Sequence, residues 1–229
     1  MGKRSIITRQ QLDGTVVDIE FLLIAVIQGL ALTTLAVESE KVIGEGQWIY
    51  WPYMITGFVL ILNFWSLAIV HSISFITWPF DLVHTLLYLL VAFIEVAAFA
   101  EITQPGMWFV FTFAFFLVSW FLYAWDLRMI RERQSDFLDS AAKTRLYEDI
   151  FRQQSNAVRF MLPPAILFHA AVVATLWLAP DVILGGDRHL IVVGAQLVSG
   201  LVFLAVIILG YRTRQRLISD CIEDDAPER

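Results

Sequence analysis

Four polar side chains lie on one face of an apolar stretch that spans residues 79–101. They are Asp81, His84, Tyr88 and Glu95. Their offsets of 3, 7 and 14 residues place them within about 60° of one another on a helix, which turns by about 100° per residue. An ionisable group in a membrane-spanning helix costs free energy unless a partner or water receives it. The stripe therefore predicts a functional site or a polar pathway inside a membrane.

Glu95 is the most informative of these side chains because it falls at mid-depth in the stretch. A carboxylate that leaves water without a partner takes up a proton. A protonatable carboxyl group at this depth can serve a proton relay or a cation site. Alternatively, His169 or Asn63 holds Glu95 in a static hydrogen bond that joins helices. Both interpretations stay open at this point.

Other polar side chains of the apolar stretches fall into two layers. Near the inner face of the membrane we expect Asp18, Glu20, His71, Asp81, His84, Asp126 and Arg159. At mid-depth we expect Gln28, Asn63, Glu95 and His169. From these layers and the stripe we take as candidate residues of a pathway or polar site Asp81, His84, Tyr88, Glu95, Asn63, His71, Asp126 and His169.

The candidate residues include ligand types of transition-metal sites, namely histidine and aspartate. The sequence has no paired spacing such as HxxH, so it identifies no metal, and haem ligation by two histidines on facing helices is a weaker alternative. The motifs GxSxG, HExxH, CxxC and the P-loop are absent. The sequence thus predicts no cofactor and gives no positive sign of an enzyme.

Composition defines the fold class as an all-α integral membrane protein. Of the 229 residues, 58% are hydrophobic and 17% are charged, whereas soluble domains have about 45–50% apolar and about 25% charged residues. A spanning segment must satisfy its own backbone hydrogen bonds, which favours helices here, because barrel strands alternate over about 10 residues. We predict six transmembrane helices at 16–37, 51–74, 79–101, 107–127, 157–179 and 190–211.

Lysine and arginine predict the orientation of these helices. Fourteen of them lie on the side that holds the N-terminal segment 1–15, the connection 128–156 with the mouth of the fifth helix, and the acidic tail 212–229. Only Lys41 and Arg188 lie on the other side. The positive-inside rule then places both termini in the cytoplasm. We expect a multi-pass protein of a bacterial-type inner membrane, with helices one to four in 16–127 and helices five and six in 157–211.

The connection 128–156 is the largest predicted part outside the bilayer. It contains neither proline nor glycine, so we expect helical extensions of the fourth and fifth helices, joined as a hairpin by a break near Asp139-Ser140. The hairpin is either a solvated connection or a docking site for a cytoplasmic protein. In the fifth helix, Pro163-Pro164 predicts a bend that frees carbonyl groups, which neighbours or water must satisfy.

The six-helix plan and the chain length resemble those of the bacterial relatives of the lysosomal potassium channel. That family begins its first helix with an arginine followed by Phe-Ser-Asp. In this sequence the corresponding region reads Arg9-Gln10-Gln11-Leu12-Asp13-Gly14, without the Phe-Ser pair. The resemblance is therefore one of layout, and it implies no functional residue.

Two functions fit these observations. The leading hypothesis is a membrane protein that moves an ion or a small solute along the polar stripe, working as a homo-oligomer because six short helices form a small bundle. The alternative is a non-transporting subunit or scaffold that docks a cytoplasmic partner through the 128–156 hairpin. Under either hypothesis the protein lies in the lipid bilayer. Nucleic acid is not an expected partner, because the membrane topology accounts for the positions of the basic residues.

Overall fold

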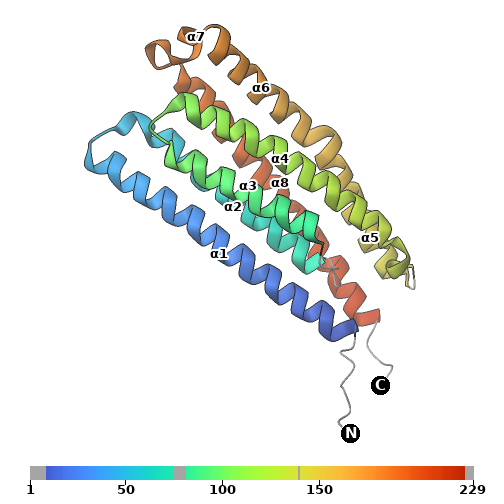
Figure 1. The fold of residues 1–229 in the computed structure, drawn as a ribbon. Coiled ribbons are helices and arrows are strands. Elements are labelled where there is room, and N and C mark those ends of the chain that lie inside the picture. Colours follow the sequence, from blue (N-terminus) through green and yellow to red (C-terminus); the bar gives the residue numbers. More distant parts are fainter. Residues whose placement is uncertain (1–8, 75–80, 139, 225–229) are drawn as a thin grey trace.

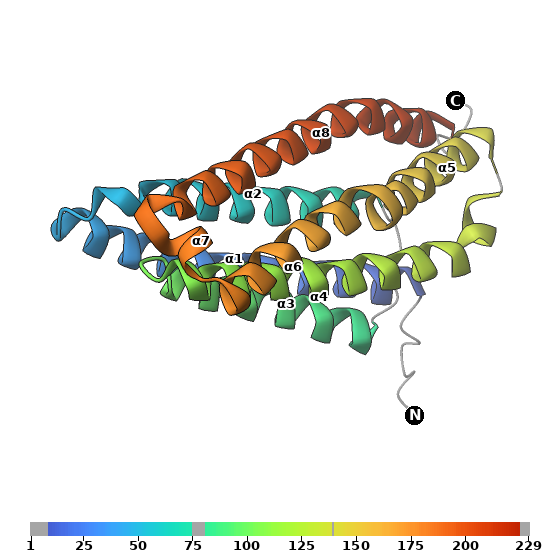
Figure 2. The same ribbon diagram turned by 90° about the horizontal axis from the view of Figure 1, so that it is seen from above.

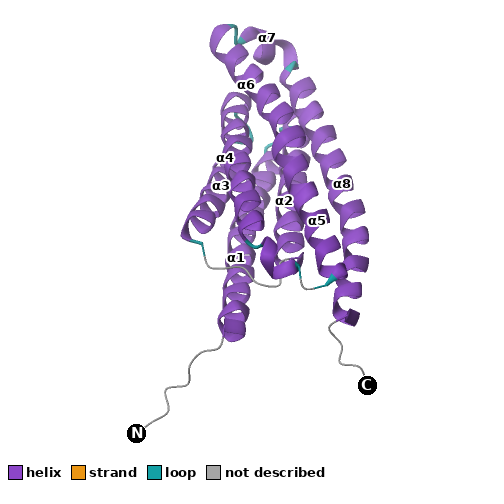
Figure 3. Ribbon diagram, turned by 90° about the vertical axis from the view of Figure 1, so that its right-hand side faces the viewer, coloured by secondary structure: helices purple, strands orange, loops and turns teal. Residues whose placement is uncertain are grey.

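Every regular element in the described part of the chain is helical (Figure 3). The computed structural model describes residues 9–74, 81–138 and 140–224, and the side chains of Asp18, Glu20 and His71 lie outside its described part. Within these described ranges, six helices are long and apolar enough to cross a membrane. The predicted number of spanning helices is therefore confirmed.

The bundle is built from long helices that connect through short turns. The long helices are α1 (Arg9–Gly44), α2 (Trp51–Ser74), α3 (Leu82–Ala100), α4 (Pro105–Glu132), α6 (Leu162–Leu178) and α8 (His189–Asp224). The shorter elements are α5 (Ala141–Asn156), α7 (Asp181–Leu184), the 3-10 turns η1 (Trp48–Tyr50), η2 (Gln134–Phe137) and η4 (Gly185–Asp187), and the π-helical turn η3 (Ala157–Met161).

Helix α3 lies between α1 and α4, and this neighbourhood decides what the stripe contacts (Figures 1 and 2). On one side α6 packs against α4, and on the other α2 packs against both α1 and α8. Helix α5 packs against α8 and the end of α4. Helix α1 begins and α8 ends at the same end of the bundle, which we call the terminal end, while α7 lies at the opposite end, the α7 end (Figure 1).

Several helices differ in extent from the predicted spans; α8, for example, runs to Asp224 rather than to 211, and two of the other differences have a local cause. Helix α1 continues beyond residue 37 to Gly44, because its last turns hold good helix formers and the ion pair Lys41 Nζ–Glu38 Oε1 at 2.6 Å. Helix α3 begins at Leu82 rather than at 79, since the Asp81 carboxylate caps it by accepting the His84 backbone N–H at 2.8 Å. Pro79 lies outside the described residues.

The connection between α4 and α6 is a helical hairpin that packs against the ends of α4 and α8. Helix α4 runs to Glu132, and α5 starts after Ser140, whose hydroxyl accepts the Lys143 backbone N–H at 3.2 Å. One face of α5 is buried in an apolar cluster with the ends of α4 and α8, and this cluster includes Ile130, Leu146, Ile150 and Cys221. The apolar face of α5 is thus occupied by the protein itself.

The π-helical turn η3 joins α5 to α6 next to Pro163-Pro164, where a carbonyl group lacks its helical N–H partner. Within η3 the Leu162 N–H donates to the carbonyl of Ala157, five residues back. In this register the carbonyl of Val158 would need an N–H from Pro163, which has none. The indole Nε1–H of Trp120 in α4 donates to the Val158 carbonyl instead, at 3.0 Å. A neighbouring helix therefore satisfies the freed carbonyl group, as the proline pair predicts.

We expect the Trp120→Phe variant to be less stable than the wild type by about 1–2 kcal/mol, because the partly buried Val158 carbonyl loses its donor. Unfolding of the detergent-solubilised protein by a denaturing detergent measures this loss. Trp177→Phe, on the neighbouring helix α6, is the matched control, because the Trp177 side chain is 82% exposed. Equal stability losses in the two variants would contradict the role of the Trp120 indole.

Candidate functional site

The polar stripe of α3 faces the interior of the bundle. Tyr88 is 9% exposed and Glu95 is 1% exposed, whereas Phe93, on the opposite face of α3, is 73% exposed. The stripe thus points away from the exposed apolar face of α3, and its side chains meet α1, α2 and α4. The stripe is therefore a row of polar side chains inside the bundle rather than a solvated face of the helix.

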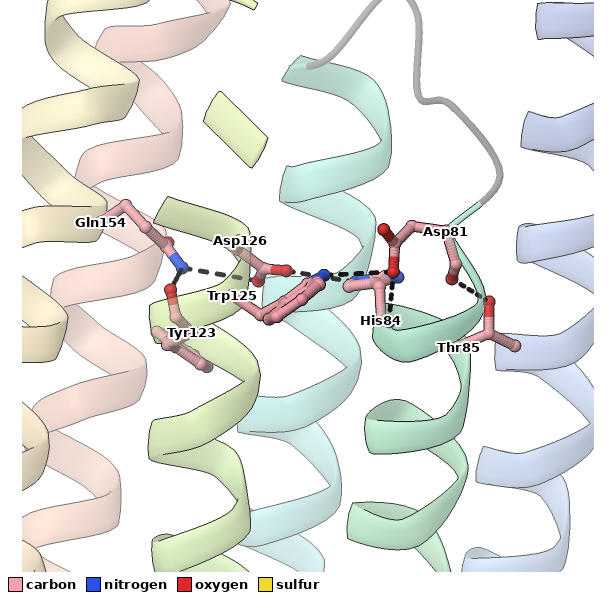
Figure 4. A network of polar contacts seen from close by, with 7 residues as sticks. All are labelled: Asp81, His84, Thr85, Tyr123, Trp125, Asp126 and Gln154. Atoms are coloured by element: carbon pink, nitrogen blue, oxygen red, sulfur yellow. Dashed lines mark hydrogen bonds and ion pairs between the residues drawn. The ribbon is translucent and has the colours of Figure 1, made fainter. Parts of the chain in front are cut away.

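At the terminal end of α3, polar groups from three helices form a network (Figure 4). One Asp81 carboxylate oxygen accepts both the His84 backbone N–H and the indole Nε1–H of Trp125, the latter at 3.1 Å. The Nε2 atom of His84 lies 3.3 Å from Oδ1 of Asp126. The amide of Gln154 in α5 donates to Oδ2 of Asp126 at 3.4 Å and to the Tyr123 carbonyl at 3.0 Å. This terminal network joins α3, α4 and α5.

A cavity of about 60 Å³ lies beside the terminal network, between α1, α2, α3 and α4. Its polar lining comes from His84, Thr85, Tyr88, Tyr123 and Asp126, and the rest of its wall is apolar. A water molecule needs about 10–15 Å³ of such volume and several polar partners. The cavity therefore has the size and the polar groups to hold water next to a histidine and a carboxylate, which are groups that exchange protons.

Glu95 lies further along the same face and has one polar partner that the structure describes. The Gln28 amide Nε2–H donates to Glu95 Oε2 at 3.3 Å. Oε1 of Glu95 and Oε1 of Gln28 are buried, and neither has a hydrogen-bond partner among the described residues. The pair therefore holds two unsatisfied buried oxygen atoms, a costly arrangement for a carboxyl group that is 1% exposed.

Apolar packing separates the Glu95–Gln28 pair from the cavity. Tyr88 lines the cavity, and its ring stacks on Phe64 with ring centroids 4.9 Å apart. Beyond Tyr88, one turn before Glu95, come Val91 and Ala92, which are 0% and 1% exposed. Since a helix rises about 1.5 Å per residue, Glu95 lies about 10 Å beyond Tyr88. The stripe therefore has two sections. The first, around His84 and Tyr88, borders the cavity; the second, around Glu95, is enclosed by apolar side chains, and we call it the dry section.

His169 belongs to a different network, which lies toward the α7 end. Its Nδ1 lies 2.7 Å from the Ala165 carbonyl, so Nδ1 carries the donated proton and Nε2 accepts from Gln196 Nε2 at 2.8 Å. The Gln196 Oε1 in turn accepts the indole N–H of Trp108 at 2.9 Å, and its amide also lies 3.3 Å from Thr112 Oγ1. This Gln196 network joins α4, α6 and α8, and both the oxygen and the nitrogen of the glutamine amide have partners.

The structure thus brings together some of the predicted site residues and separates others. Asp81, His84 and Asp126 share the terminal network, and Tyr88 lines the cavity beside it. Glu95 contacts Gln28 rather than His169 or Asn63, and Asn63 donates instead to the carbonyls of Val59 and Gly200 at 2.8 and 3.0 Å. The side chain of His71 lies outside the described residues.

The candidate list omitted several members of these networks, and two of them, Gln154 and Trp108, show why. Gln154 falls in the connection that the sequence assigns to water, yet it continues the buried face of α5 at i+4 from Ile150. That spacing was the available signal. Trp108 lies near the end of a predicted spanning stretch, where tryptophan usually faces the membrane interface. In the structure it is 0% exposed and donates to Gln196. Its burial had no signal in the sequence.

Among the described residues, no group of three or more His, Cys, Asp or Glu side chains is placed to hold a metal ion. Comparisons with protein-family models, with curated proteins and with solved structures find no match. The described residues define the class by themselves: a multi-pass membrane protein with six helices long and apolar enough to span a membrane and a buried polar stripe on the third.

Proposed function

We propose that this protein moves protons or a small cation across a bacterial-type inner membrane along the stripe of α3. One observation carries the proposal: a fully buried carboxyl group with an unsatisfied oxygen lies on the same helix face as a cavity lined by His84 and Asp126. Groups that only join helices would be satisfied by each other, as in the Gln196 network. In this proposal the terminal end is cytoplasmic, as the distribution of lysine and arginine predicts.

The stripe supplies two different steps of such a pathway. Water in the cavity can exchange protons with His84 and Asp126, which lie 3.3 Å apart. Glu95 then receives the transferred species in the dry section. The apolar section around Val91 and Ala92 prevents a continuous leak, so transfer requires a movement of α3 or of its neighbours that lets water reach Glu95.

Flux through liposomes that contain the purified protein tests this proposal. A pH-sensitive dye inside the liposomes reports protons, and a membrane potential set by potassium and valinomycin drives them. We expect the Glu95→Gln variant to reduce flux to the level of protein-free liposomes, because glutamine is close in size and cannot bind a proton. Glu101→Gln is the matched control, since Glu101 caps the same helix off the stripe.

Two outcomes would contradict the proposal. One is the absence of proton, sodium or potassium flux with the wild-type protein. The other is a flux that Glu95→Gln leaves unchanged.

Docking of a cytoplasmic partner and assembly into a homo-oligomer stay predictions from the sequence. The apolar face of α5 is already buried against α4 and α8. A partner at the hairpin would therefore meet its polar face, where Arg145, Glu148 and Arg152 are exposed.

A further inference from the structure

The two unsatisfied oxygen atoms at Glu95 and Gln28 define what this site binds. A carboxylate offers only acceptors, and the Gln28 carbonyl oxygen is also an acceptor. With Glu95 ionised, the two side chains share one donor, the Gln28 amide, among their buried oxygen atoms. One additional donor between the two side chains would satisfy both remaining oxygen atoms at once.

We propose that this donor is a proton on Glu95, so that Glu95 and Gln28 form a carboxylic acid–amide pair and the species bound at the site is a proton. The acid O–H at Oε1 donates to the Gln28 carbonyl while the Gln28 amide donates to Oε2. Release of the proton leaves a carboxylate and breaks only the hydrogen bond from Oε1. This inference deepens the proposed function and shares its site, but its test does not require transport.

The surroundings of the pair favour a neutral acid, because the side chains that the structure describes around it carry no compensating charge. The residues one turn before and after Gln28 on α1 are Ile24 and Ala31, and those one turn before and after Glu95 on α3 are Val91 and Phe99. All four are buried and apolar. The described buried polar side chains of α2 and α4 are Thr56, Asn63, Thr112 and Ser119, which are uncharged, and Asp126, which lies with His84 in the terminal network. The next titratable side chain along the stripe is Tyr88.

The same surroundings disfavour a metal cation. Hard cations such as calcium and magnesium take about six or more oxygen ligands. The pair supplies three side-chain oxygen atoms, and no metal-binding group of three or more His, Cys, Asp or Glu exists among the residues that the structure describes. A proton needs only the two oxygen atoms that are left over.

Infrared spectroscopy of the full-length protein in liposomes tests this inference. We expect a carbonyl band of a protonated carboxyl group at neutral pH, which shifts in heavy water and is lost in Glu95→Gln. Glutamine at position 95 can still pair with Gln28, so this variant should fold as the wild type does. Glu101→Gln serves as control and should keep the band.

A second variant tests the pairing itself. Gln28→Leu removes both hydrogen bonds of the amide, so the Glu95 band should persist but move to the higher frequency of a carboxyl group without a hydrogen bond. A band that stays at the same frequency in Gln28→Leu would overturn the acid–amide pair, and a band that survives in Glu95→Gln would overturn the proton on Glu95.

The infrared result and the flux result separate the two proposals. A Glu95 band without any flux would uphold the proton-binding pair and refute transport. Flux that depends on Glu95 without a Glu95 band would uphold transport and refute the bound proton, and a flux of sodium or potassium would then identify the transported species.

Discussion

The Gln196→Leu variant is expected to lose about 2–4 kcal/mol of stability. Leucine has a volume similar to that of glutamine but can neither donate nor accept a hydrogen bond. The substitution therefore leaves the indole N–H of Trp108 and Nε2 of His169 without their partner. These side chains are 0% and 3% exposed, and each orphaned buried group costs about 1–3 kcal/mol.

Unfolding in mixed micelles with a denaturing detergent measures this loss. Gln215→Leu is the matched control, because it makes the same change at an exposed position of α8, where the Gln215 side chain donates only to the Tyr211 hydroxyl among the described hydrogen bonds. The control should change stability by less than about 0.5 kcal/mol. A similar loss in both variants would show that the Gln196 network does not hold α4, α6 and α8 together.

The Gly200→Ala variant is expected to destabilise the packing of α8 on α2 by about 1–3 kcal/mol. A Cβ atom at position 200 would lie 2.9 Å from Cγ1 of Val59. Val59 is 4% exposed and is stiff because it is branched at Cβ. The helices cannot simply move apart, since the Gly200 carbonyl accepts the Asn63 amide at 3.0 Å.

Gly194→Ala provides the control for this prediction, because it makes the same change on the same helix with no atom within 4 Å of the new Cβ. It should be neutral or stabilising by up to about 1 kcal/mol, since alanine is the better helix former. Combining Gly200→Ala with Val59→Ala should recover part of the loss through a favourable coupling between the two positions. If the losses of the two single variants simply add in the double variant, the strain does not arise from the contact between position 200 and Val59.

The sequence was sufficient for features that depend on periodicity along one helix. The number of helices able to span a membrane follows from apolar length, and the described part of the chain contains the six that were predicted. The inward direction of Glu95 and Tyr88 follows from their sharing a face that interrupts an apolar surface. Both features are local, because the spacing of residues on one helix determines them.

The partners of these residues depend on the order of helices around the bundle, which periodicity does not contain. Helix α3 lies between α1 and α4, so Glu95 meets Gln28, while His169 on α6 lies behind α4. Asn63 likewise contacts α8 because α2 packs against that helix. The extent of the helices also differed from prediction where a local cap decided it, as at Asp81.

The π-helical turn has a consequence for which residue of α6 faces the bundle. Eighteen residues complete about five turns of an α-helix, so an unbroken helix would align Phe168 with Ile150, which is 3% exposed. In the structure Phe168 is 38% exposed, and the next residue, His169, is 3% exposed. The extra residue in η3 advances the phase of α6 by one position. It thereby turns a histidine inward where a regular helix would have placed a phenylalanine.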